Sequence, residues 1–383
     1  MPFDIVALKN VWRRPTRSVL TCIGIALAVA TAVALLGFAS GLERSSLEVY
    51  GAHGVDMVVL RSGVSERLTS NLDERIAERL AALPAVRAVN PSLTDLISFG
   101  DRSLIGIPVH GWPADRFAVA TLQVIDGRRV SDRDRAAVML GQGLAAGLNK
   151  CVGDEVEIES HQFSIVGIYQ GANLLENSTA VMRLPELQEL MDRPRQVTEF
   201  QLQLHDNLGD ARRVAELLRP QIAALTNAQG KPLGLAAMAT EEFVTGSAEV
   251  RMAQGMAVAT SLIALLISSI SVLNTMIMSV FERTQEIGAL RAIGWRRSRV
   301  LRMVLGESCL LSAVGGLLGI GVAWPCILLL SRAPALEGFI RPELSATAVG
   351  EGLMLTMLLA VAGGFYPAYR AMRIAPSEAL RYE

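Results

Sequence analysis

Cysteine and histidine are scarce in this chain, which has four of each among its 383 residues. Cys22, Cys309 and Cys326 lie within long uncharged runs, so Cys151 is the only cysteine outside them. A disulfide between two cysteines outside the uncharged runs is therefore excluded. We expect Cys151 to be a packed, small hydrophobic residue rather than a reactive thiol.

The four histidines, His53, His110, His161 and His205, are scattered, without Cys or carboxylate partners at the spacing of metal sites. We expect them to face solvent or to be structurally bonded, and we predict no metal site. No combination of Ser, His, Asp or Cys indicates a catalytic centre, so we predict that the chain is not an enzyme.

A nucleotide-binding loop of the form G-x-x-x-x-G-K-S/T is also lacking, since Gly230 and Lys231 are followed by Pro232. Such a loop holds phosphates with its backbone N–H groups. We therefore expect this chain to bind no cofactor, ATP and Mg²⁺ included.

Long uncharged runs are what the chain does have. They cover 18–42, 252–281, 308–331 and 352–369, and each is near or above the roughly 20 residues of a bilayer-spanning helix. The first run has an alternative interpretation as a secretory signal, because four basic residues precede it. Its length, greater than that of a signal core, favours a transmembrane helix.

Basic residues in short flanks resist translocation and so predict orientation. Residues 1–17 contain four of them, and 282–302 contains six Arg and two Glu, whereas the opposite loop, 332–343, has only Arg332 and Arg341. Both termini and the 282–302 loop are therefore predicted to be cytoplasmic.

The segment 43–250 is then extracytoplasmic. It contains 20 Lys and Arg against 28 Asp and Glu, a net charge of −8. An acidic domain argues against binding to nucleic acid. Its pattern predicts a mixed α+β fold: helices over 71–83 and 207–226, and strands over 86–92, 104–109, 155–159, 163–169 and 199–204, with a hairpin around 160–161.

We therefore predict an α-helical membrane protein with four transmembrane helices plus a mixed α+β extracytoplasmic domain inserted between the first and second. The segments are a cytoplasmic amphipathic elbow helix (1–17), transmembrane helix 1 (18–42), the extracytoplasmic domain (43–250), helix 2 (251–281), a cytoplasmic loop (282–302), helix 3 (303–331), an external loop (332–343), helix 4 (344–371) and a cytoplasmic tail (372–383).

Two of the spans have special features. The second is long enough to protrude from the bilayer as a rod, although a tilted span with a frayed external end fits equally well. The third carries Gly315, Gly316 and Gly319, and this small-residue pattern predicts close helix packing, within one chain or between two.

Three blocks carry a resemblance to a known family: ALKNVWRRPTRSVLTCIGIALAV, ERTQEIGALRAIGWRRSRVLRMVLGESCLLS and YPAYRAMRIAPSEALRYE. In this order and spacing they resemble the permease subunits of MacB-type and FtsX-like ABC transporters. The match covers the membrane half, and the external domain resembles the family only in position and general character.

The resemblance implies a multi-pass protein of the bacterial cytoplasmic (inner) membrane, working as a homodimer, or as a pair of related permeases, with two copies of an ABC ATPase subunit that bind ATP and Mg²⁺. Because only 17 residues precede the first span, we expect that ATPase to be a separate chain. Further implied partners are membrane lipid and a periplasmic adaptor or lipoprotein. No nucleic acid is expected.

By resemblance, the 282–302 loop contains a coupling helix that docks on the ATPase. The residues expected to couple are Glu282, Arg283, Glu286, Arg291 and Trp295 as contacts, with Gly288 and Gly294 as shape requirements. From the residues themselves, 285–293 can form a short helix with Ile287, Leu290 and Ile293 on one side. The alternative is a topological anchor whose Arg residues bind anionic lipid.

Two functions share these features. One is ATP-driven export or extraction of a lipid, lipoprotein, peptide or small molecule at the outer side of the membrane. The other is an FtsX-type signalling scaffold that activates an external effector such as a cell-wall hydrolase. A third interpretation, a membrane enzyme, lacks a candidate site.

Overall fold

The computed structural model describes residues 15–64, 67–100, 104–205, 211–227, 229–331 and 346–374. The chain divides into two compact units. The bundle comprises residues 1–40, 253–333 and 342–383, and the head consists mainly of residues 41–252. The predicted external loop and nearly all of the predicted elbow helix and cytoplasmic tail lie outside the described residues.

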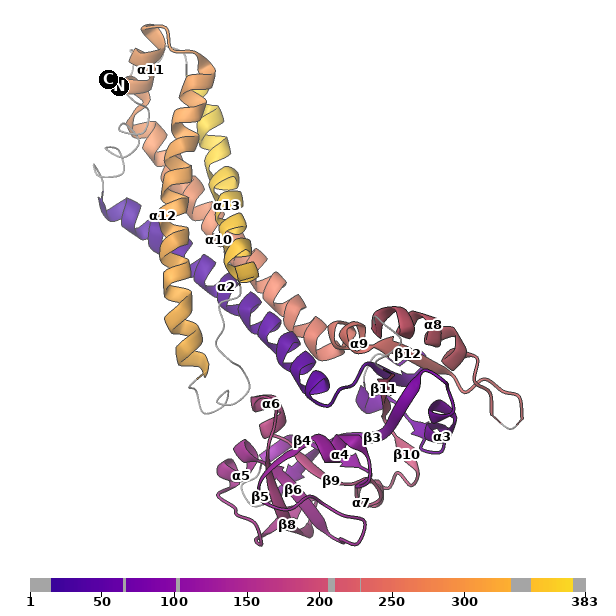
Figure 1. The fold of residues 1–383 in the computed structure, drawn as a ribbon. Coiled ribbons are helices and arrows are strands. Elements are labelled where there is room, and N and C mark those ends of the chain that lie inside the picture. Colours follow the sequence, from indigo (N-terminus) through magenta and orange to yellow (C-terminus); the bar gives the residue numbers. More distant parts are fainter. Residues whose placement is uncertain are drawn as a thin grey trace. The chain divides into compact units, whose positions relative to one another are not determined.

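The bundle contains α2 (Pro15–Ala52), α10 (Ala248–Glu282), α11 (Thr284–Ala292), α12 (Arg297–Ser331) and α13 (Ala346–Met372), as Figure 1 shows. Among the described residues, α2, α10, α12 and α13 are long and apolar enough to cross a membrane. The prediction of four transmembrane helices, with a mixed α+β domain between the first and second, is confirmed.

Helices α2 and α10 extend beyond the apolar runs that predicted them. The charges of Glu43 and Arg44 end the apolar run of α2, but neither residue breaks a helix, and α2 continues to Ala52. Helix α10 is already helical at Ala248, and its 35 residues span about 52 Å. Both helices therefore contribute residues to the head as well as to the bundle.

The glycines of α12 allow other helices to approach closely. A Cβ atom at Gly315 would lie 2.8 Å from the Cβ of Ile25, and one at Gly319 would lie 2.6 Å from the carbonyl oxygen of Ala26. Both neighbours belong to α2. Gly316 instead faces Thr356 of α13. The small residues of α12 thus contact two different helices of the same chain.

Within the described residues the head contains a ten-stranded sheet in the order β12-β1-β11-β3-β4-β9-β6-β8-β5, with β7 paired to β3 and β8. The strands are β1 (Met57–Arg61), β3 (Val86–Phe99), β4 (Leu104–Trp112), β5 (Gln123–Gly127), β6 (Ala137–Gly141), β7 (Glu155–Ile158), β8 (His161–Gln170), β9 (Ala180–Arg183), β11 (Glu199–Leu204) and β12 (Leu235–Ala239). The smaller elements of the head are η1 (Arg67–Thr69), β2 (Leu72–Asp73), β10 (Gln196–Val197), α3 (Ile76–Ala81), α4 (Phe117–Thr121), α5 (Gln142–Leu148), α6 (Leu174–Asn177), α7 (Leu184–Leu190), α8 (Ala211–Ala223) and α9 (Thr240–Gly246).

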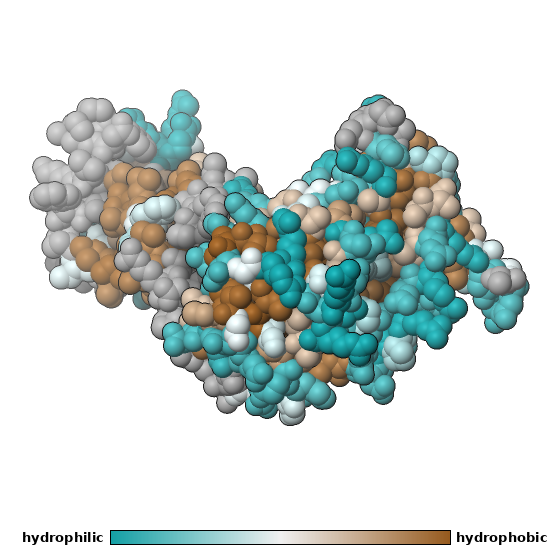
Figure 2. Space-filling model, turned by 60° about the horizontal axis from the view of Figure 1, so that its bottom comes forward, coloured by the Kyte–Doolittle hydropathy of each residue, from teal (hydrophilic) through white to brown (hydrophobic). Residues whose placement is uncertain are grey.

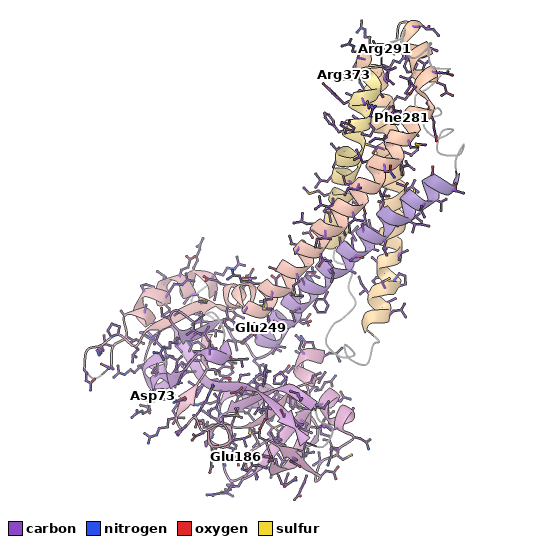
Figure 3. The ribbon with its side chains drawn as sticks, turned by 180° about the vertical axis from the view of Figure 1, so that it is seen from behind. Asp73, Glu186, Glu249, Phe281, Arg291 and Arg373 are labelled. Atoms are coloured by element: carbon purple, nitrogen blue, oxygen red, sulfur yellow. The ribbon has the colours of Figure 1, made fainter. Side chains whose placement is uncertain are left out.

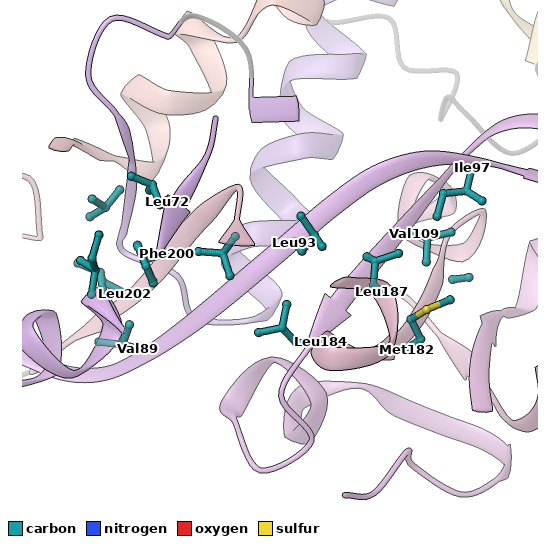
Figure 4. Packing of buried hydrophobic residues seen from close by; sticks show 14 of the residues in the cluster. Leu72, Val89, Leu93, Ile97, Val109, Met182, Leu184, Leu187, Phe200 and Leu202 are labelled. Carbon is teal, nitrogen blue, oxygen red and sulfur yellow. The ribbon is translucent and has the colours of Figure 1, made fainter. Parts of the chain in front are cut away.

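The long strand β3 joins the two halves of this sheet. Residues 86–92 pair with β11, and residues 93–99 pair with β4. The core follows the strand from one half to the other: Phe200 and Leu202 pack near its start, and Val109 and Met182 pack near its end (Figure 4). A single hydrophobic core therefore holds both halves together.

Several predicted elements of the head have different bounds. The helix expected over 71–83 is limited to α3, because residues 72–73 instead pair with β10 as a strand. The strand expected over 86–92 continues to Phe99, since β4 offers it a second partner. The hairpin is confirmed: β7 and β8 are antiparallel, and Glu159 and Ser160 adopt positive φ in the turn.

The surface of the head is mostly polar. On the face shown in Figure 2, hydrophobic residues form separate patches among hydrophilic ones. Among the described residues of the head, the exposed large hydrophobic residues are Leu96, Ile105, Ile125, Leu174, Leu217 and Met252. Such a surface suits a domain that faces water.

Candidate coupling surface

The connection between α10 and α12 folds into α11 and a tight turn. The hydroxyl of Thr284 donates to the carbonyl of Val280 at 3.1 Å, in the last turn of α10. At the other end, the N–H of Gly294 donates to the carbonyl of Arg291, and the N–H of Trp295 donates to that of Leu290, both at 3.1 Å.

This pair of bonds closes a helix around a left-handed residue, and Gly294 has a φ of +102°. A side chain would be strained in this conformation. Gly294 therefore fixes the direction in which the chain leaves α11.

One side of α11 packs against the bundle. Ile287 and Gly288 are buried, and Ile287 joins a hydrophobic cluster with residues of α10 and α12. Leu290 is half-buried, whereas Ile293 is 80% exposed. Ile293, expected on the same side as Ile287 and Leu290, differs from them in burial because α11 ends at Ala292 and the chain turns there.

Interactions within the chain involve at least four of the expected contact residues, Arg283, Glu286, Arg291 and Trp295. The Arg283 Nε donates to Glu286 at 2.9 Å, and its Nη1 lies 3.5 Å from Glu307 of α12. The Arg291 Nη1 donates to the carbonyl of Met372, at the end of α13, at 3.4 Å. Trp295 is half-buried against the hydrophobic cluster. These contacts anchor α11 to α12 and α13.

The same end of the bundle is rich in Arg and aromatic residues, and Figure 3 shows Phe281, Arg291 and Arg373 together there. Three guanidinium groups lie over rings, each about 4.5 Å from the ring centroid. The pairs are Arg299 with Trp295, Arg370 with Phe281 and Arg373 with Tyr369.

The exposed surface around α11 presents both charge and an apolar side chain. Glu286 of α11 is exposed, as are Glu282 at the end of α10 and Ile293 just beyond the end of α11. Sequence reasoning missed Ile293 as a surface residue, and the signal that could have found it is the glycine that follows, which marks a helix end. Arg296 and Arg297, also exposed, extend this surface.

A second concentration of polar groups is buried in the head. The Nε2 of His53 lies 2.7 Å from Glu176, and the other ring nitrogen contacts the hydroxyl of Thr121. Asn173 caps α6 and donates to the carbonyl of Ser45 at 2.6 Å. Ser45 lies near the end of α2 and His53 directly follows it, so these bonds fasten that end to α6 and α4.

The remaining histidines and Cys151 are either exposed or hydrogen-bonded within the head. His110 bonds to Thr94, while His161 and His205 are exposed. Cys151 is exposed rather than packed, because it lies in a polar turn before β7. Among the described residues, no three His, Cys, Asp or Glu side chains are grouped to hold a metal ion.

The head also has an open groove of about 440 Å³ along β2 and β10. Its lining residues are Asn71, Asp73, Arg75, Pro194, Arg195 and Gln196. Arg75 donates to Asp73 at 2.6 Å, and this bond lowers the pKa of the Asp73 carboxyl group. The charged lining suits a polar partner better than an apolar small molecule.

Comparisons with known families match both units. Residues 18–219 match the family described as MacB-like periplasmic core domain, and this match covers more than half of the chain. Residues 258–376 match the family described as FtsX-like permease C-terminal.

Individual relatives extend over nearly the whole chain. The macrolide export ATP-binding/permease protein MacB of Nitrobacter winogradskyi is 26% identical over 96% of this chain, which spans 58% of that protein. The ABC transporter permease YknZ of Bacillus subtilis is 26% identical over 99% of this chain and 98% of its own length.

Among solved structures, the periplasmic region of MacB from Actinobacillus actinomycetemcomitans is similar in fold. The match covers 51% of this chain and 94% of that structure. The two share 17% identity, with a TM-score of 0.38.

Proposed function

The chain belongs to the MacB-like and FtsX-like family of ABC transporter permeases, and from this premise we propose that it transmits ATP-driven motion from a separate ATPase to its head. The head then exports or extracts a substrate at the outer side of the inner membrane. Lipids, lipoproteins, peptides and small molecules are the candidate classes. The chain acts as a homodimer with two ATPase copies and binds neither ATP nor Mg²⁺ itself.

The observation that carries this proposal is the anchoring of α11. Buried Ile287 and the bond from Arg291 to Met372 attach one side of the helix to the bundle. Glu286 of α11 is exposed, as are Glu282 and Ile293, the residues that flank the helix region. A short helix held in this way can receive a push from a bound partner and pass it to the long helices.

The proposed orientation places this surface in the cytoplasm and the head outside. Exposed Arg residues lie near α11. Because basic residues resist translocation across the membrane, this end of the bundle should stay in the cytoplasm. The polar, acidic head suits the opposite, aqueous side. Both chain termini are then cytoplasmic.

The exposed face of α10 supports the dimer. In the most apolar 18-residue stretch of α10, only 22% is buried within one chain. The corresponding buried share is larger in each of the other three spans found among the described residues. Met256, Ile263, Ile267 and Ile270 lie on this exposed face. We propose that a second copy covers part of it and that membrane lipid covers the rest.

The docking test uses Ile293→Asp, because Ile293 is exposed and has no role in anchoring α11. The tagged chain is purified from its native membranes, and the ATPase that co-purifies is quantified. We expect the variant to lose most of that ATPase, because a charge would be buried in the docked surface. The matched control, Glu189→Arg on the exposed surface of the head, should retain it.

Retention of the ATPase by Ile293→Asp would remove α11 as the docking element. Reversing the charges of Glu286 and Arg291 together should likewise abolish stimulated ATP hydrolysis while leaving membrane insertion intact. Because Arg291 also bonds to Met372, that double variant cannot separate docking from anchoring, whereas Ile293→Asp can.

The FtsX-type scaffold is the second candidate, supported by the match of residues 258–376. The match of the head to a MacB-like core domain favours substrate handling instead. Cross-linking of the head in intact cells separates the two functions. An external hydrolase captured in stoichiometric amounts would favour the scaffold.

A further inference from the structure

Glu307 is a charged residue almost fully buried in the bundle. It lies in the first third of α12, within a segment long and apolar enough to span a membrane, and is only 7% exposed. One carboxylate oxygen lies 3.5 Å from Nη1 of Arg283, and the other accepts a hydrogen bond from the hydroxyl of Ser279 at 3.4 Å. Buried charges in membrane helices are costly and commonly functional.

Arg283 is the single residue between α10 and α11, so its guanidinium lies where three helices meet. It donates to Glu286 of α11 at 2.9 Å and pairs with Glu307 of α12, and its side chain is 18% exposed. We call Ser279, Arg283, Glu286 and Glu307 the Arg283 clasp. A planar guanidinium holds two carboxylates in a fixed geometry, which a Lys ammonium would not.

The Arg283 clasp is better suited to fixing the orientation of α11 against α12 than to stabilising the folded chain. A buried ion pair rarely adds net stability, because desolvation of its charges offsets their attraction. Removing one partner is costly, since the other charge is left buried alone. The pair therefore favours one arrangement of α11 against α12 and penalises others.

From α12 the contacts continue to the helix that enters the head. Gly315 and Gly319 bring α12 against α2, near Ile25 and Ala26. Helix α2 then continues without interruption to Ala52. A displacement of α11 thus has a continuous packed path, through α12, to a helix that belongs to both units.

We propose that Glu307 is a positioning residue that, through Arg283, makes α12 move with α11. This inference rests on the proposed docking of the ATPase at α11. It also gives Arg283 a different role from the one that the family resemblance implies: Arg283 transmits the motion within the chain and does not bind the ATPase.

Glu307→Gln tests the proposal, because it removes the charge and keeps the size and the bond to Ser279. Two quantities are measured on the complex purified from native membranes: the amount of ATPase bound and its rate of ATP hydrolysis. We expect binding within about twofold of wild type, and a loss of about tenfold in stimulated hydrolysis, equivalent to about 1.4 kcal/mol of coupling.

The double variant Arg283→Gln with Glu307→Gln should lose no more than Arg283→Gln alone, because Glu307 acts through Arg283. Glu351→Gln is the matched control, since Glu351 is an acidic residue of the α13 span and is exposed. It should leave both quantities unchanged.

Full stimulation in Glu307→Gln would overturn the clasp while leaving α11 docking intact, provided that Ile293→Asp still releases the ATPase. Loss of ATPase binding in Glu307→Gln would also overturn it, because Glu307 would then support docking or folding rather than transmission. If Ile293→Asp has no effect either, the proposed function itself fails.

Discussion

Some charged residues near α11 are exposed, as the sequence predicts, but the sequence does not predict which of them form ion pairs inside the bundle. The exposure of Glu286 follows from helical spacing, because Ile287 next to it occupies the buried side of α11. The pairing of Arg283 with Glu307 does not follow, since 24 residues separate them and only packing of α11 on α12 brings them together. The sequence thus located the charged surface but not which of its charges turn inward.

The ion pair between Asp134 and Arg128 in the head predicts how the stability of the head depends on pH. Its carboxylate accepts two bonds from Arg128, at 2.6 and 2.7 Å, and one from the N–H of Ser131. These bonds, chiefly those from Arg128, hold the pKa of Asp134 below its usual value. A lowered pKa means that the stabilisation is complete above the unfolded pKa of about 3.9 and is lost as pH falls through the folded pKa.

We expect Asp134→Asn to destabilise the head by about 1 kcal/mol near neutral pH, a modest value because Arg128 is 56% exposed. The difference from wild type should shrink below about pH 4. Hydrogen exchange of the β6 amides in the full chain measures it, with Asp126→Asn on the exposed edge strand β5 as control. A difference that persists unchanged in acid would contradict the role of the Arg128 bonds.

Whole elements were predicted well where hydrophobic pattern alone decides them. The four long helices, the β7–β8 hairpin and β11 follow from apolar runs and alternation. The predicted helix over 71–83 is shorter, because residues 72–73 find a strand partner more than 120 positions away, in β10. Such a partner overrides local propensity and leaves no local signal.

The packing of α12 on α2 gives a test at the scale of elements. Gly319→Val should force the two helices apart, because its Cβ would lie 2.6 Å from a backbone oxygen that cannot move aside. We expect a loss of about 1–3 kcal/mol and a lower unfolding temperature of the full chain in detergent.

Gly321→Val is the matched control in the same helix, since a Cβ there meets nothing within 4 Å. Equal stability of the two variants would show that α12 does not approach α2 as closely as the structure indicates.

At the scale of the whole molecule, the family and the general layout were accessible from three sequence blocks, and the fold of the head was not. The head depends on long-range pairing, with β3 joining two halves whose other strands come from distant parts of the chain. Its buried network at His53, Glu176 and Asn173 likewise links the end of α2 to residues more than 120 positions later. Position and composition cannot specify such contacts.

The account depends on the head and α11 facing opposite sides of the membrane. Cys151, exposed on the head, is a natural probe for one side, and Ile293→Cys provides the other. Each is tested as the single cysteine in a chain whose other cysteines are replaced by Ala, using a membrane-impermeant maleimide on spheroplasts. We predict that Cys151 is labelled at once and that a cysteine at position 293 is labelled only after lysis. Labelling of both positions before lysis would contradict the transfer of motion across the membrane.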